Sequence, residues 1–275
     1  MQNFSELPAP SAASGAAVSG TDSRLCATGL FKSFGKTAAL NGVDVGVRAG
    51  ESLAIMGPSG SGKSTLLLAL AGIERPEAGS VMYRPDGGQP VDVAKLSDGA
   101  RSRLRRTDFG FVFQQGLLIP ELTAEENVAL PLMVTGAPRA AATATAREWL
   151  ARLGLAGMEE RRMGQLSGGQ AQRVAIARAQ AGGATVTFAD EPTGALDSET
   201  SREVMDILLA TTVGRGASLV LVTHDAQVAA LCDRTLTLKD GRISHQFFRT
   251  QAAPEQAQAG QSPAAQVTPR KGEAA

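Results

Sequence analysis

Short apolar runs recur through the middle of the chain, and each ends at a polar or glycine-rich segment. They occupy residues 52–56, 109–113, 185–189 and 218–223. Runs of this length, bounded by turn signals, are typical of strands buried on both faces of a parallel sheet. The segment 64–71, after the first run, carries leucines at helical spacing and predicts a helix. Ligands bind at the carboxyl ends of such strands, so the polar residues there are candidates for chemistry.

The regions around these runs have different patterns. Residues 24–50 read as short strands with turns at Asn41-Gly42 and Ala49-Gly50, which predicts a small antiparallel β region. Residues from about 118 to 180 predict a helical lobe, in which 140–153 is the clearest helix. The pattern therefore predicts an α/β fold with a parallel sheet core, a small antiparallel β region and a helical lobe.

Composition separates the two ends of the chain from this folded part. Residues 1–23 are rich in Ala, Ser, Gly and Pro, and residues 249–275 are rich in Ala, Gln and Pro. Such segments bury too little apolar surface to fold. We expect two disordered tails and one folded domain over residues 24–248.

The bulk numbers fit one sizeable core with an attached lobe, since the chain has 275 residues and 43% hydrophobic content. Lysine plus arginine number 27 and aspartate plus glutamate number 27, a net charge of +0. A nucleic-acid binder usually shows a basic excess, so no nucleic-acid partner is expected. We interpret the basic run at Arg101, Arg103, Arg105 and Arg106 as a solvated helix face or a patch facing anionic lipid.

Cysteine usage and apolar run length bear on the environment of the chain. The 2 cysteines, Cys26 and Cys232, lack metal-ligand spacing and are expected to be reduced thiols of a cytosolic protein. No apolar run approaches the roughly 18 residues of a membrane-spanning helix, and the N-terminus lacks a signal-peptide pattern. A membrane role is therefore expected to come through a partner.

A glycine-rich phosphate-binding motif follows the first apolar run. Its sequence is Gly57-Pro58-Ser59-Gly60-Ser61-Gly62-Lys63-Ser64-Thr65. The glycines allow several backbone N–H groups to turn toward one point, and the following helix adds its positive dipole end. Lys63 supplies a charge for the β- and γ-phosphates, and Ser64 offers a hydroxyl to Mg²⁺. The motif predicts a P-loop that binds a nucleoside triphosphate with magnesium.

Two adjacent acids, Asp190 and Glu191, end the apolar run at 185–189. Adjacent side chains at a strand end point in different directions, so the two carboxylates are expected to have different roles. Asp190 would hold Mg²⁺, and Glu191 would polarise the attacking water as general base. A solvated acidic turn is the alternative for this doublet taken alone.

A second motif identifies a family. Leu166-Ser167-Gly168-Gly169-Gln170 precedes the helical sequence 172–179, and with the P-loop it resembles the ATP-binding cassette (ABC) ATPases. Ser167 and Gly169 would lie at a helix N-terminus, where a hydroxyl, backbone N–H groups and the helix dipole meet a γ-phosphate. Serine is also a good N-cap, so an ordinary capped helix is the alternative for this motif alone.

The resemblance assigns roles to further residues. Gln114 resembles the Q-loop glutamine, which contacts Mg²⁺ and the attacking water. Asp197, in Ala195-Leu196-Asp197, resembles the D-loop residue that reaches across a dimer interface. His224 resembles the switch histidine that contacts the γ-phosphate. Phe34 resembles the aromatic side chain that stacks on adenine, with a place in the core as its alternative.

The resemblance also implies an assembly. It implies a P-loop NTPase with a RecA-like core, and a head-to-tail homodimer. Two ATP molecules would lie between the P-loop of one subunit and the segment Ser167, Gly168, Gly169 and Gln170 of the other. The phrases at 122–132 and 189–197 resemble the group that serves lipoprotein release, macrolide and antimicrobial-peptide export, and cell division. In that group a separate integral-membrane permease holds the ATPase on the cytoplasmic face of the membrane.

Other functions fit the sequence less well. Signalling or cell division through a permease-like partner is the alternative to transport. DNA-acting ABC ATPases insert a long coiled coil, but the stretch between Lys63 and Ser167 lacks sustained heptads. Ribosome-acting types carry two cassettes in one chain. A P-loop kinase or GTPase would leave Gln114, Asp197 and His224 unexplained.

Overall fold

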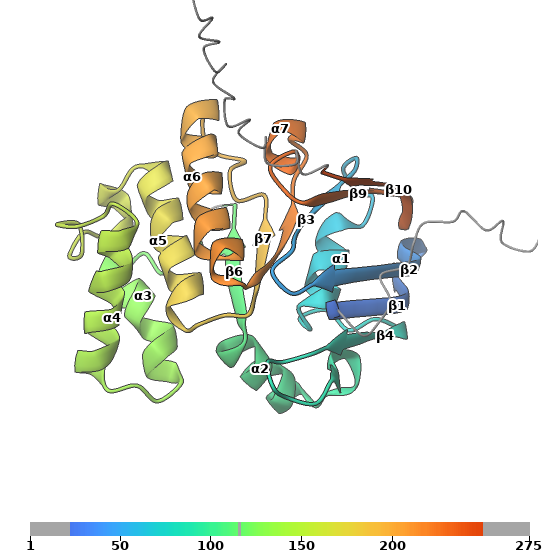
Figure 1. The fold of residues 1–275 in the computed structure, drawn as a ribbon, viewed down its shortest axis with the longest axis horizontal. Coiled ribbons are helices and arrows are strands. Elements are labelled where there is room, and N and C mark those ends of the chain that lie inside the picture. Colours follow the sequence, from blue (N-terminus) through green and yellow to red (C-terminus); the bar gives the residue numbers. More distant parts are fainter. Residues whose placement is uncertain (1–22, 115–116, 250–275) are drawn as a thin grey trace, which may run out of the picture.

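A computed structural model describes residues 23–114 and 117–249, and it places the strands of that part in two sheets (Figure 1). The strands are β1 (Ser23–Phe34), β2 (Thr37–Arg48), β3 (Ser52–Met56), β4 (Ala78–Tyr83), β5 (Val91–Asp92), β6 (Phe109–Phe113), β7 (Val186–Asp190), β8 (Ser218–Val222), β9 (Arg234–Lys239) and β10 (Arg242–Phe248). The α-helices are α1 (Lys63–Leu70), α2 (Asp98–Thr107), α3 (Ala124–Val134), α4 (Arg139–Arg152), α5 (Gly168–Ala181), α6 (Ser198–Thr211) and α7 (Ala226–Ala229). The predicted tails lie almost wholly outside the described residues.

The apolar runs form the predicted parallel sheet. Its strand order is β10-β9-β3-β8-β7-β6, and β10 is antiparallel to β9 while the other neighbours are parallel. Successive residues of a strand face opposite sides of the sheet. Leu53 and Ile55 therefore belong to a core shared with α1 and the second sheet. Ala54 faces a second core, which the helices α3 to α6 share.

The second sheet is antiparallel, with the order β2-β1-β4-β5. The turn at Ala49-Gly50 is confirmed, but the turn expected at Asn41-Gly42 is wrong, because β2 runs through it. Leu30 pairs with Val43 and Phe31 with Asn41, so Gly42 is an extra residue in β2. Its φ of 73° and the Phe31 ring against its Cα make it a bulge, which keeps a strand going where a turn would end it.

The helical lobe consists of α3 and α4 with α5, which lies between them and the six-stranded sheet (Figure 1). A capping box starts α3, since Thr123 Oγ1 accepts from the N–H of Glu126 and Glu126 accepts from the N–H of Thr123. The buried amide of Gln172 in α5 donates to the carbonyl of Phe113, the last residue of β6, at 3.1 Å. Helix α5 thus joins the lobe to a strand end.

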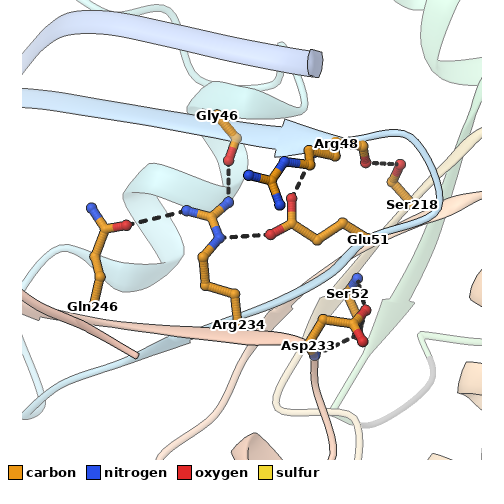
Figure 2. A network of polar contacts seen from close by, with 8 residues as sticks. All are labelled: Gly46, Arg48, Glu51, Ser52, Ser218, Asp233, Arg234 and Gln246. Carbon is orange, nitrogen blue, oxygen red and sulfur yellow. Dashed lines mark hydrogen bonds and ion pairs between the residues drawn. The ribbon is translucent and has the colours of Figure 1, made fainter. Parts of the chain in front are cut away.

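A buried ion pair ties the two sheets together (Figure 2). Arg234 of β9 is 2% exposed, and its Nε donates to Glu51 Oε1 at 2.6 Å. The same guanidinium donates to the carbonyl of Gly46 in β2 and to Gln246 in β10. Glu51 also accepts from the N–H of Arg48 at 2.7 Å. A buried charge needs such complete pairing, because unpaired it would cost several kcal/mol.

Three further expectations have an outcome in the described part. Both cysteines are free, as predicted, and burial raises the pKa of the Cys232 thiol to about 12. The basic run on α2 is only partly a solvated face, since Arg101 pairs with Asp98 and Arg105 donates to the carbonyl of Gly72. In residues 23–114 and 117–249 the helices are too short or too polar to span a bilayer.

Candidate functional site

The glycine-rich loop connects β3 to α1, and its neighbours leave no room for side chains at two positions. Gly57 and Gly62 have φ values of 144° and 102°. A Cβ added to Gly57 would lie 2.1 Å from the carbonyl oxygen of Leu238, and one added to Gly62 would lie 2.0 Å from that of Ala39. Only glycine fits these sites. Gly60, with a φ of 76°, turns the exposed tip of the loop into open space.

The polar groups of the loop fit a phosphate ligand. Pro58 and Ser59 are exposed, Thr65 is half-buried, and α1 begins at Lys63, so its first N–H groups point toward the loop. Lys63 Nζ donates to the carbonyl of Pro58 at 2.9 Å. Ser61 is 4% exposed, and its hydroxyl has no hydrogen-bond partner among the residues that the structure describes. Backbone donors, a helix N-terminus and an ammonium group are the elements that bind polyphosphate.

The next pair of residues comes from two different elements. The Ser64 hydroxyl at the start of α1 donates to Asp190 Oδ1 at the end of β7, over 3.3 Å. Burial raises the pKa of Asp190, and the nearby Glu191 carboxylate raises it further. A divalent cation beside Asp190 would favour the ionised carboxylate and so oppose both increases in its pKa. In the part of the chain that the structure describes, no three His, Cys, Asp or Glu residues cluster for a metal. Mg²⁺ would therefore complete its shell with phosphate oxygens and water.

Glu191 has a different partner from Asp190, which contacts Ser64. Its φ is 48°, a left-handed conformation that non-glycine residues rarely adopt. The Glu191 N–H donates to the carbonyl of Val222 at 2.9 Å, which fixes this turn to β8. Glu191 Oε1 then lies 2.9 Å from His224 Nδ1, just after β8. Strained backbone of this kind is concentrated at functional sites, and here it aims one carboxylate at a histidine.

Gln114 lies against the same segment. It follows β6, the neighbour of β7 in the sheet. A Cβ added to Gly194 would lie 2.8 Å from Gln114 Nε2, so the amide rests on the backbone three residues after Glu191. The ends of three adjacent strands thus bring Gln114, Asp190, Glu191 and His224 to one edge of the sheet.

The motif at 166–170 starts helix α5. Ser167 Oγ accepts from the Gln170 N–H at 3.2 Å, and Gln170 Oε1 accepts from the Ser167 N–H at 3.0 Å. Ser167 therefore caps the helix, which was the alternative to ligand binding for this motif taken alone. Ser167 and Gly168 remain exposed, whereas Gly169 is buried, and its Cα hydrogen faces the Thr200 methyl group. The helix N-terminus is held firmly and faces outward.

Asp197 and Phe34 lie beyond the group of residues at the strand ends. Asp197 caps α6, since its two carboxylate oxygens accept from the N–H and the hydroxyl of Thr200 at 3.0 and 2.7 Å. These hydrogen bonds lower the pKa of Asp197. Phe34 ends β1 and is 53% exposed, with Lys32 Nζ 5.3 Å from its ring centroid, so it is not a core residue.

The predicted residues thus form two groups. The P-loop joins Asp190 through Ser64, and Glu191 contacts His224. The segment Ser167–Gln170 packs instead against Leu196 and Thr200 beside Asp197. Within the described ranges, no hydrogen bond or ion pair connects this second group to Gly57–Thr65. Each half of the predicted nucleotide site is thus held by polar contacts of its own.

Comparison with known proteins decides the family. The family model described as "ABC transporter" matches residues 40–194, which include the P-loop, the segment at 166–170 and the Asp190-Glu191 pair. This chain belongs to the ABC transporter family. The ABC chain is 46% identical to a macrolide export ATP-binding/permease protein, MacB 2 of Aeromonas hydrophila, over 79% of its own length. That match spans 33% of the relative, so the chain corresponds to about a third of such proteins.

A second relative is covered almost completely. The ABC chain is 44% identical to the lipoprotein-releasing system ATP-binding protein LolD of Geobacter metallireducens, over 78% of this chain and 95% of that protein. Among solved structures it resembles the ATP-binding cassette MJ0796, in a dimeric post-hydrolysis state bound to ADP and Pi. The identity is 38% and the TM-score 0.73, over 82% of this chain and 98% of that chain. The P-loop NTPase fold with its α/β core is thereby confirmed.

The sequence did not reveal one segment that touches the P-loop of this ABC chain. The turn between β9 and β10 approaches it closely, through the carbonyl of Leu238 and the N–H of Gly241, which donates to the carbonyl of Ser61 at 3.2 Å. An Asp-Gly pair at 240–241 signals a tight turn. Nothing in that pair indicates which residues the turn contacts, because they lie about 180 positions earlier in the chain.

Proposed function

We propose that this chain is the ATP-hydrolysing subunit of an ABC transporter that exports or releases its cargo through a separate membrane permease. The observation that carries the proposal is the convergence of the P-loop, Asp190, Glu191 and His224 at the carboxyl ends of β3, β7 and β8. The relatives named for macrolide export and lipoprotein release support the direction of transport.

ATP binding would use the residues predicted from sequence. The backbone N–H groups of 57–65 surround the phosphates, and Lys63 moves from the Pro58 carbonyl to the β- and γ-phosphates. Phe34, exposed at the end of β1, stacks on the adenine. Mg²⁺, when bound, neutralises charge on the phosphate oxygens. Ser64, Asp190 and Gln114 would hold it.

Hydrolysis would depend on Glu191 and His224. Glu191 accepts a hydrogen bond from the attacking water and polarises it. His224 fixes the carboxylate through the 2.9 Å contact at Nδ1, which leaves Nε2 to meet the γ-phosphate. Gln114, resting on Gly194, would orient the water from the other side. Positioning and charge neutralisation of this kind account for most catalysis of phosphoryl transfer.

The complete site would require two copies of the chain. Among the described residues, the segment Ser167, Gly168, Gly169 and Gln170 makes no hydrogen bond to the P-loop of its own chain, and Ser167 and Gly168 are exposed at the helix N-terminus. In a head-to-tail homodimer they would cover the γ-phosphate held by the partner, and Asp197 would lie at the interface. ATP would favour the closed dimer and ADP the open one, because only ATP has the phosphate that both subunits contact.

The helical lobe offers a surface for the permease. Among the described residues, nine large hydrophobic side chains are exposed, and four belong to the lobe surface of Leu117, Ile119, Met133 and Val134. Arg178 Nη1 donates to the carbonyl of Leu117 at 2.8 Å and lines an adjoining cavity of about 260 Å³ with Arg105 and Arg106. Apolar and cationic groups together fit a cytoplasmic permease segment that carries apolar and acidic side chains. The chain would thus be peripheral on the cytoplasmic face.

Two measurements test the proposal. The purified chain should release phosphate from ATP, and removing Mg²⁺ with EDTA should stop the release. Capture of the chain from solubilised membranes with ATP and vanadate should recover a stoichiometric polytopic protein. The extracytoplasmic domain of that protein would indicate whether the complex transports a cargo or transmits a signal. Recovery only with ribosomes or nucleic acid would contradict the transporter role and leave the ATPase activity intact.

A charge on the lobe surface should weaken the permease complex. Val134 is 57% exposed, and we expect Val134→Asp to reduce permease recovery about tenfold, since an aspartate would be buried in an apolar contact. ATP hydrolysis by the free chain should stay unchanged. Phe247→Asp is the matched control, because Phe247 is 62% exposed on β10, away from the lobe (Figure 1). If Val134→Asp and Phe247→Asp recover equal amounts of permease, the permease does not bind at the lobe surface.

A further inference from the structure

The turn between β9 and β10 lies directly under the phosphate-binding loop. The Gly241 N–H donates to the carbonyl of Ser61 at 3.2 Å. One turn residue earlier, Asp240 has a φ of 50°, and the strand before it places the Leu238 carbonyl against the Cα of Gly57. One short stretch of chain thus contacts this loop at both Gly57 and Ser61.

The same turn also holds strand β2. The carbonyl of Gly241 accepts from the Asn41 N–H at 2.8 Å, and the Arg242 guanidinium donates to Asn41 Oδ1 at 3.1 Å. The Cα of Gly241 faces the Ala39 carbonyl, which is the group that also packs against Gly62. A single glycine is thus hydrogen-bonded to the P-loop on one side and to β2 on the other.

These contacts join the two ends of the nucleotide site. Strand β2 forms a hairpin with β1, at whose tip Thr37 pairs with Phe34, the residue proposed to stack on adenine. The P-loop binds the phosphates. The distance between β2 and the P-loop therefore sets the spacing between the adenine contact and the phosphate contacts. A change in this spacing would weaken nucleotide binding, because the two contacts would no longer be pre-organised for one ligand.

We propose that Gly241 is a positioning residue for nucleotide binding, which holds the P-loop and β2 at the spacing that ATP requires. This inference rests on the proposed ATPase function. Gly241 acts through the carbonyl of Ser61 and the N–H of Asn41, and its φ of 71° and its close approach to the Ala39 carbonyl mean that an added side chain would strain the turn.

Gly241→Ala tests the inference. The new Cβ would lie 3.0 Å from the Ala39 carbonyl oxygen, so the turn must shift by a few tenths of an ångström and carry Ser61 with it. We expect the dissociation constant for MgATP, measured by calorimetry, to rise about tenfold. The KM for ATP should rise by a similar factor while kcat changes less than about twofold, because the loss affects ground state and transition state equally.

A control separates positioning from plain backbone strain. Gly216 has a φ of 81°, and no atom of the described residues lies within 4 Å of an added Cβ. It lies just before β8, at the opposite end of that strand from His224. Gly216→Ala should therefore lower the midpoint of urea unfolding through its positive φ alone. Its affinity for MgATP should stay at the wild-type value.

A second variant keeps the test valid if Gly241→Ala folds poorly. Asparagine tolerates positive φ better than alanine but introduces the same Cβ, so Gly241→Asn should be more stable and still bind MgATP more weakly than Gly216→Ala. Wild-type chain that fails to bind MgATP would overturn the proposed function. The positioning role alone would be overturned if the wild-type chain binds MgATP and the Gly241 variants bind it with an affinity within about twofold of that of Gly216→Ala.

Discussion

Glu191→Gln is expected to lower ATP turnover by at least about 10²-fold while MgATP binding stays intact. Glutamine has nearly the same shape and can still accept a hydrogen bond from His224, whose Nδ1 lies 2.9 Å from Oε1. It lacks the charge that polarises water. The binding groups, from the P-loop to Asp190, belong to other elements and remain in place.

The measurement is single-turnover phosphate release, together with calorimetric affinity for MgATP. Glu148→Gln is a matched control, because Glu148 is 68% exposed on α4 and pairs only loosely with Arg152 at 3.7 Å. Its turnover should equal that of the wild type. Turnover of Glu191→Gln within about threefold of this control would remove Glu191 from the mechanism.

Ser167→Arg is expected to abolish ATP-driven dimerisation. Ser167 is exposed at the start of α5, where we propose that the nucleotide of the partner arrives. A long cationic side chain there would occupy the space of the γ-phosphate contact. Light scattering after size-exclusion chromatography should show a dimer for Glu191→Gln with ATP, and a monomer when Ser167→Arg is added.

Loss of the helix cap could by itself weaken the interface, so a second variant is needed. Aspartate caps helices as well as serine does, but its negative charge would repel a γ-phosphate. Ser167→Asp should therefore keep the thermal stability of the wild type and still prevent the dimer. Dimerisation of both variants with ATP would contradict the shared site. If Ser167→Arg prevents the dimer and Ser167→Asp does not, the arginine acts by steric exclusion and Ser167 does not contact the phosphate.

Much of the catalytic core was predictable from sequence, because its signals are local. A buried parallel strand is a short apolar run, and each run at 52–56, 109–113, 185–189 and 218–223 became a strand within one residue. The P-loop is likewise a contiguous motif. The polar residues at the strand ends were likewise recognised as candidates, although the contacts of Glu191 with His224 and of Ser64 with Asp190 are seen only in the structure.

The features that sequence did not reveal depend on contacts between distant residues. Gly42 resembled a turn because Asn-Gly often forms one, yet pairing with β1 extends the strand and makes the glycine a bulge. The contact of Gly241 with Ser61 joins segments about 180 positions apart, and no local pattern encodes it. By contrast, the bonds of Asp197 to Thr200 are local, and only the structure shows that both carboxylate oxygens are used.

The buried arginine of Figure 2 also limits how far the chain can be shortened. Its partners are contributed by residues 46, 51 and 246, so strands from both ends of the domain satisfy one guanidinium. The ring of Phe248 covers the same group, 5.8 Å from its carbon. A chain cut after β9 would keep the buried guanidinium of Arg234 and lose its contacts with Gln246 and Phe248. The last strand is therefore part of the minimal stable domain, although it carries none of the nucleotide-binding residues.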